Sequence, residues 1–130
     1  MSPPETSEQS IADFLSGYPP EIRAICARLR RLVTSVAPDA CEIPNLRQNH
    51  IAYSSSDKMR DCILYICPLL EWVRLGFYYG GGLDDPAHLV VGEGKRMRHV
   101  KVRSVVEADA EALRLLTAAA WSAGVAAHAR

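Results

Sequence analysis

The chain has 130 residues and a mass of 14.3 kDa, which is the size of one domain. Its 15 Lys and Arg residues balance its 15 Asp and Glu residues, and 48% of the chain is apolar. This composition excludes a disordered chain and a globally basic nucleic-acid-binding protein, and no run of about 18 apolar residues is present to span a membrane. We expect one domain over residues 1–130, with an ordered core from about residue 8 to about residue 124.

The N-terminal seven residues are polar and lack both the basic start and the apolar segment of a secretion signal. We therefore expect a cytoplasmic protein, in which thiols stay reduced. None of the four cysteines forms a Cys-x-x-Cys pair, and the odd separation of Cys62 and Cys67 predicts that they face opposite sides of a strand. We expect no zinc site, and we expect Cys26 and at least one of this pair to be buried.

The first part of the chain predicts two helices. Residues 7–15 form a short amphipathic segment that ends before Pro19, and Pro20 suits the first turn of the next helix. From Ile22 to Val36 apolar residues recur at i, i+3, i+4 and i+7, the pattern of a helix with one buried stripe, and Pro38 ends it.

The middle of the chain predicts strands over residues 51–53, 62–67, 72–79 and 99–103. The break at Pro68 is typical of an antiparallel hairpin with a loop of about four residues. A long glycine-rich connection follows from residue 80 to about residue 97, and an Ala-rich helix over residues 107–123 closes the chain, with Gly124 as its stop. Because the helices and strands do not alternate, we predict an α+β fold in which two N-terminal helices and one C-terminal helix pack on an antiparallel sheet of about five strands.

Two short motifs stand close together, Gly-Glu-Gly-Lys at residues 92–95 and Arg-His-Val-Lys at residues 98–101. With the arginine-rich second helix and the Ala-rich closing helix, they make the chain resemble the YdhG-like family of small bacterial domains, a family of unknown function, over about residues 10–121. The resemblance implies an α+β fold with an antiparallel sheet. One branch of that family is described as frataxin-like iron chaperones, so the resemblance also implies iron as cargo, but it supplies no catalytic residues.

Six cationic or titratable residues lie within nine positions, from Lys95 to Arg103. Alternation places His99, Lys101 and Arg103 on one face of their strand. It likewise places Trp72, Arg74 and Tyr78 on one face of the preceding strand. If the two strands pair, cations and aromatic rings form one surface that suits an anionic or aromatic small ligand. The candidate ligand-binding residues are Trp72, Arg74, Tyr78, Gly92, Gly94, Lys95, Arg98, His99, Lys101 and Arg103. The alternative is a solvated outer face whose charges protect a sheet edge.

The glycines at residues 92–94 and the lysine after them resemble a phosphate cradle, but Arg96 stands where a P-loop has Ser or Thr, which favours a plain turn. Four oxygen- or imidazole-bearing residues share the same long connection and are weak candidates for a hard metal such as iron. They are Asp84, Asp85, His88 and Glu93. Their spacing fits no closed metal motif, and Asp followed by Pro is also ordinary turn chemistry.

No nucleophile motif is present, and His50 and His128 stand alone in the sequence. We therefore predict a non-enzymatic binding protein for a small anionic ligand or a partner. The alternatives are a frataxin-like iron chaperone and a homodimeric interaction module that pairs through a sheet edge or the Ala-rich helix. The zero net charge is a sum over segregated segments, because residues 5–21 contain four acids and no base, residues 23–31 four bases and no acid, and residues 95–103 five Lys and Arg.

Overall fold

The computed structural model describes residues 7–129, so the polar lead-in over residues 1–6 and the C-terminal Arg130 lie outside the described residues. The described chain forms four α-helices and one antiparallel sheet of six strands in the order β1-β2-β3-β4-β6-β5. The helices are α1 (Ser7–Leu15), α2 (Pro20–Val36), α3 (Val105–Ala108) and α4 (Glu111–His128). The strands are β1 (Cys41–Asn45), β2 (His50–Ser54), β3 (Cys62–Pro68), β4 (Val73–Phe77), β5 (Val90–Val91) and β6 (Arg98–Val102). The predicted α+β class is confirmed.

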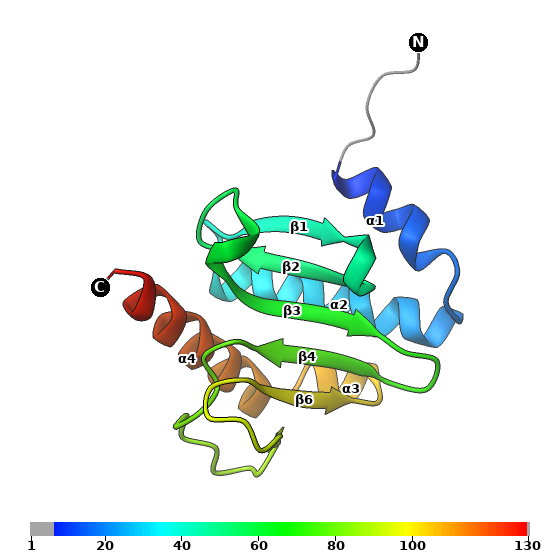
Figure 1. Ribbon diagram of the computed structural model, residues 1–130. Helices are drawn as coiled ribbons and strands as arrows, with labels where there is room; N and C mark the ends of the chain where they lie inside the picture. The colour runs from blue at the N-terminus through cyan, green and yellow to red at the C-terminus, as the bar shows by residue number, and fades with distance from the viewer. Residues whose placement is uncertain (1–6, 130) are drawn as a thin grey trace.

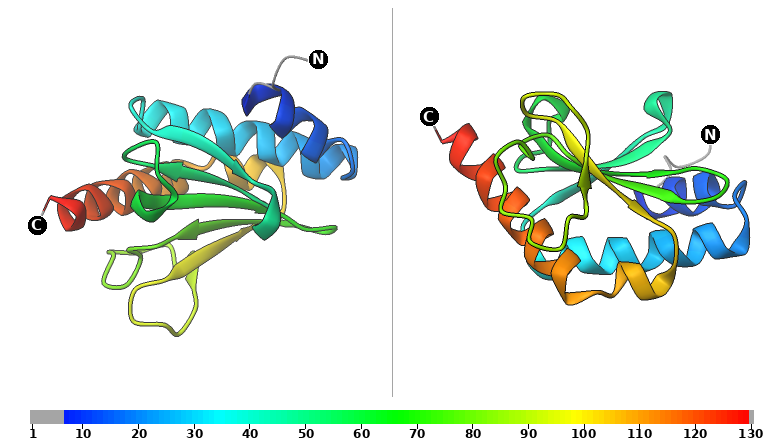
Figure 2. Two further views of the ribbon diagram at one scale, coloured as in Figure 1. Left: turned by 45° about the horizontal axis from the view of Figure 1, so that its top comes forward. Right: turned by 90° about the horizontal axis from the view of Figure 1, so that it is seen from below.

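The helices form one layer on a single face of the sheet (Figures 1 and 2). The buried residues of α2 recur with the predicted helical spacing and include Ile25, Leu29 and Val33. They pack into one core with the buried residues of β4 and β6, such as Leu75 and Val100. Alternation then directs every second side chain of these strands to the other side of the sheet, which we call the open face. No helix of the described part is long and apolar enough to cross a bilayer.

Two strands were not expected from the sequence. β1 lacks an alternating apolar pattern because its inner position is Glu42, whose carboxylate binds Arg30 of α2, and because it contains Pro44. Proline is tolerated there because β1 is an edge strand. β5 is only two residues long and pairs with β6 at the opposite edge. Neither edge strand has the alternating apolar pattern from which strands are predicted.

The C-terminal helix differs from the prediction at both ends. Ser104 accepts a hydrogen bond from the amide of Glu107 and starts α3, and the extended backbone of Ala110 separates α3 from α4. The predicted stop at Gly124 is wrong, since α4 continues to His128. Gly124 is buried inside the helix against Ile63 of β3, so it is present for close packing and not for ending the helix.

Candidate functional site

The two strands that carry the predicted cations and aromatic residues are neighbours. β4 and β6 pair antiparallel, with Arg74 opposite Lys101 and Gly76 opposite His99. The pairing on which the sequence hypothesis depends is therefore present. It gathers on the open face four side chains that we call the Trp72 cluster: Trp72, Arg74, His99 and Lys101.

The ring of Trp72 is the centre of this cluster. Lys101 Nζ lies 4.9 Å from the ring centroid, and Arg74 Cζ lies 5.5 Å from it. The imidazole of His99 stacks on the same indole with a centroid separation of 6.4 Å and an interplanar angle of 20°. Burial lowers the pKa of His99, and the positive charges of Arg74 and Lys101 lower it further. The cluster therefore combines two permanent cations with a histidine that is biased towards its neutral form.

The cations of the cluster are not neutralised by acids within residues 7–129. Neither Arg74 nor Lys101 forms an ion pair with a carboxylate there. The Nε atom of Arg74 is buried and has no hydrogen-bond partner. Buried polar groups are almost always paired in native proteins, so an unpartnered guanidinium nitrogen is an exception that needs an explanation.

Aromatic rings continue from the cluster across the open face. Tyr65 of β3 lies over Gly76, where a Cβ atom would come within 1.9 Å of its ring carbon Cε1. Its ring centroid is 5.6 Å from that of Tyr78 and 4.9 Å from that of His50. Burial raises the pKa of Tyr65, and the nearby Arg74 partly offsets that rise. Tyr78 was predicted from the sequence to lie on this surface, whereas Tyr65 and His50 were not, although Tyr65 follows the alternation of its strand.

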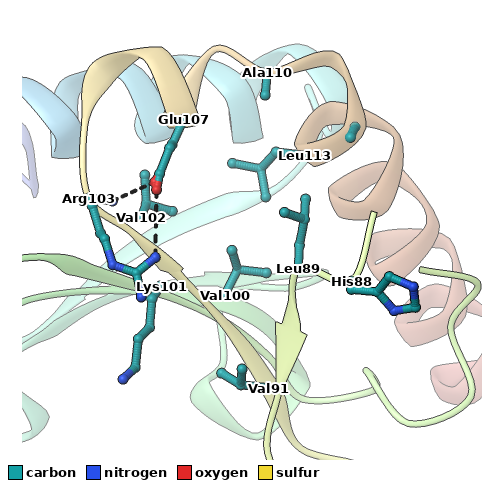
Figure 3. Close-up of a pocket in the computed structure, with 11 residues that line it drawn as sticks. His88, Leu89, Val91, Val100, Lys101, Val102, Arg103, Glu107, Ala110 and Leu113 are labelled. Carbon is teal, nitrogen blue, oxygen red and sulfur yellow. Dashed lines mark hydrogen bonds and ion pairs between the residues drawn. The ribbon is translucent and has the colours of Figure 1, made fainter. Parts of the chain in front are cut away.

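Arg103, also predicted to belong to this surface, is held by Glu107 on α3. The two side chains form an ion pair of 3.8 Å, and the amide of Arg103 donates to the same carboxylate. Figure 3 shows this pair at one end of a cavity of about 270 Å³, into which Leu89, Val100 and Leu113 point. The cavity lies on the helix side of β6, because Val100 belongs to the core.

Four further candidates lie at the other end of β6 from Trp72. Arg98 is opposite Phe77, so by alternation it shares the helix side with Val100, and its guanidinium donates to the carbonyl of Met97. The turn predicted at residues 92–95 lies in the segment that joins β5 to β6. Gly92 has a φ of 124°, which favours glycine, and its Cα faces the Arg98 side chain. Arg98, Gly92, Gly94 and Lys95 are thus separated from the Trp72 cluster.

The weak metal candidates are not gathered into a metal site. The carboxylate of Asp85 accepts hydrogen bonds from the amides of Leu89 and Val90, which is the turn chemistry considered as the alternative. Within residues 7–129, no group of three or more His, Cys, Asp or Glu side chains could hold a metal ion.

The two histidines that stand alone in the sequence have partners in the structure. His128 Nε2 lies 2.8 Å from the hydroxyl of Tyr79, and its Nδ1 lies 3.1 Å from the hydroxyl of Ser55. These contacts fasten the last turn of α4 to the sheet. His50 is 7% exposed, and its Nε2 accepts a hydrogen bond from the side-chain Nδ2 of Asn45 at 3.2 Å. Sequence patterns could not reveal either contact of His128, because the residues are far apart in the chain.

Comparison of the chain with protein-family models, with curated proteins and with solved structures finds no match.

Proposed function

We propose that the open face binds a small anionic molecule through the Trp72 cluster. The observation that carries the proposal is the Nε of Arg74, a buried donor without a hydrogen-bond partner among the described residues. Such a donor costs about 1–3 kcal/mol, and an anion that accepts a hydrogen bond from this N–H group would recover that cost. Lys101 lies beside the same indole ring and supplies a second positive charge for the same anion.

The chemistry of the surface favours a carboxylate or a phosphate attached to a flat ring. A guanidinium group binds either anion through parallel hydrogen bonds, which a single lysine cannot reproduce. Tyr65 and Tyr78 add aromatic surface beside the cations, against which a planar group can pack. A nucleic acid is a poorer fit, because the chain as a whole carries no net positive charge to bind a phosphate backbone.

Titration calorimetry and thermal unfolding with benzoate, phenyl phosphate and the neutral analogue benzamide test this proposal. We expect at least one of the two anions to bind and to raise the melting temperature, and benzamide to do neither. Arg74→Ala and Lys101→Ala should each weaken the binding by about tenfold or more, because a hydrogen bond to a charged group contributes about 1.5–3 kcal/mol. Arg74→Lys keeps the charge and loses the fork, so it should weaken binding less than Arg74→Ala.

Arg23→Ala is the matched control, since Arg23 is an exposed arginine on α2, in the helix layer behind the sheet. It removes the same charge and should leave the affinity unchanged. The proposal is wrong if neither anion binds, or if binding survives both Arg74→Ala and Lys101→Ala.

We also propose, from the sequence, that the chain is a non-enzymatic cytoplasmic binding protein and that it belongs to the YdhG-like family. Iron chaperoning, which that resemblance implies, gains no support from the hard-ligand side chains of residues 7–129. Homodimerisation likewise has no specific observation in its favour. Anaerobic titration with ferrous iron and sedimentation at high concentration separate these two alternatives from anion binding.

A further inference from the structure

A second site lies at the end of the sheet where α4 finishes, away from the Trp72 cluster. Both methionines of residues 7–129, Met59 and Met97, line one pocket of about 210 Å³ together with Cys62. The two methionines are far apart in the chain and come from different segments, so local sequence does not explain their meeting. We call these three residues the sulfur pocket.

Local geometry places the first two sulfur atoms side by side. Met59 begins the 3₁₀ turn η2 (Met59–Asp61), and Cys62 follows directly as the first residue of β3. Cys62 directly follows the turn with extended backbone, and its thiol donates a hydrogen bond to Met59 Sδ at 3.7 Å. Two sulfur ligands of one metal are about 4 Å apart when three ligands surround it and each metal–sulfur bond is about 2.3 Å long. A metal that displaces the thiol proton could therefore bridge this pair with a small movement of the side chains.

Met97 brings the third sulfur from the turn before β6. Its side chain is 50% exposed and that of Met59 is 39% exposed, whereas Cys62 is only 5% exposed. Two exposed methionines and one buried cysteine therefore line the same pocket.

We infer that the sulfur pocket binds a soft monovalent metal, copper(I), through Cys62, Met59 and Met97. Thiolate and thioether ligands select copper(I) over harder ions. On binding, the thiol of Cys62 releases its proton to solvent and its sulfur forms the bond to the metal, with no change in oxidation state. Arg60 and Arg96 also line the pocket, with Arg96 Cζ 6.0 Å from the ring centroid of Tyr79. A copper(I) thiolate is electrically neutral, so it adds no charge beside these arginines, whereas a divalent ion would add one.

Anaerobic competition between the protein and bicinchoninate for copper(I) tests the inference. We expect one copper(I) per chain, and methyl NMR with silver(I), a redox-inert substitute, should shift the resonances of both Met59 and Met97. Cys62→Ser should abolish this binding. Met59→Leu and Met97→Leu should each weaken it by at least about tenfold, because loss of an outer partner alone costs about 10- to 100-fold in metal affinity. Zinc(II) should not compete at equal concentration.

Cys67→Ser is the matched control, because Cys67 is a partly exposed thiol on the same strand and lies outside the pocket. It should bind copper(I) as the unmodified chain does. The Met59→Leu/Met97→Leu double variant keeps Cys62 and changes two exposed side chains, so it should stay folded, which circular dichroism checks. Copper(I) affinity equal to that of the unmodified chain in this double variant, or affinity lost only in Cys67→Ser, overturns the inference. Neither outcome tests the proposed anion binding, because Met59, Cys62 and Met97 do not belong to the Trp72 cluster.

Discussion

Glu42 on the inner side of β1 connects the helix layer to two strands. Its carboxylate accepts hydrogen bonds from Arg30 Nε at 2.9 Å and Nη2 at 2.8 Å, and from the hydroxyl of Tyr53 at 2.6 Å. Burial alone would raise the pKa of Glu42, but the hydrogen bonds from Arg30 and Tyr53 outweigh it and hold the pKa below its ordinary range. One acid thus fixes the position of α2 over β1 and β2.

Glu42→Gln keeps the shape of the side chain and removes its charge. We expect it to lower the free energy of unfolding by about 2 kcal/mol, because it leaves the half-buried guanidinium of Arg30 without its counter-ion. Urea unfolding followed by circular dichroism measures this loss. Glu71→Gln, at an exposed acid of the β3–β4 loop, should change the free energy little, and an equal loss in both variants contradicts the assignment.

At the scale of elements, α4 is held close to the sheet by a residue that usually weakens helices. The buried residues of α4 form a stripe that ends at Gly124, and a Cβ atom there would lie 2.4 Å from Cγ2 of Ile63. That distance is far shorter than a van der Waals contact, and the neighbouring atoms belong to a buried β-branched side chain that has little freedom to move.

Gly124→Ala therefore reverses the usual effect of this substitution. Alanine in a helix interior ordinarily stabilises by about 0.5–1 kcal/mol relative to glycine, but here overpacking should destabilise the protein by about 1–3 kcal/mol. Thermal unfolding measures the change. Ile63→Ala removes both γ carbons that a Cβ atom at Gly124 would meet, so Gly124→Ala should cost less stability in the Ile63→Ala background than in the unmodified chain. Gly17→Ala, where a Cβ atom would make an ordinary contact of 3.8 Å, should not destabilise, and a stabilised Gly124→Ala contradicts the packing argument.

At the scale of the whole molecule, periodic residues were predictable and pairings between distant segments were not. The alternation of β4 and the helical stripe of α2 identify which side chains are buried, so the face that carries Trp72 and Arg74 follows from the sequence. The neighbouring position of β6 depends on strand order, which alternation does not determine. For the same reason the position of Met97 in the sulfur pocket and the contacts of His128 could not be predicted, since each depends on segments that are far apart in the chain.

The stability of the whole fold should decrease towards acid pH in two stages. Burial lowers the pKa of His50, and burial together with two cations lowers that of His99, both from an ordinary value near 6.5. The unfolded chain therefore binds these protons first, and the free energy of unfolding falls as the pH drops below about 6.5. The pKa of Glu42 is also lowered, from near 4.5, so the stability that its ionised form provides is lost in a second decline as the pH falls through the lower pKa of the folded state.

Urea unfolding at a series of pH values from about 8 to about 3.5 measures both stages, which cover the ordinary pKa ranges of His and Glu. In the His50→Gln/His99→Gln variant the first decline should flatten while the second persists, because neither substituted side chain titrates. In Glu42→Gln the second decline should shrink while the first is unchanged. A free energy of unfolding that rises as the pH falls from 7 towards 5.5 would mean that the folded state binds these protons more tightly than the unfolded chain does, which contradicts burial of neutral imidazoles on the open face. Because the two variants change different pH ranges, they separate the contribution of the open-face histidines to the free energy of unfolding from that of the contact between α2 and β1.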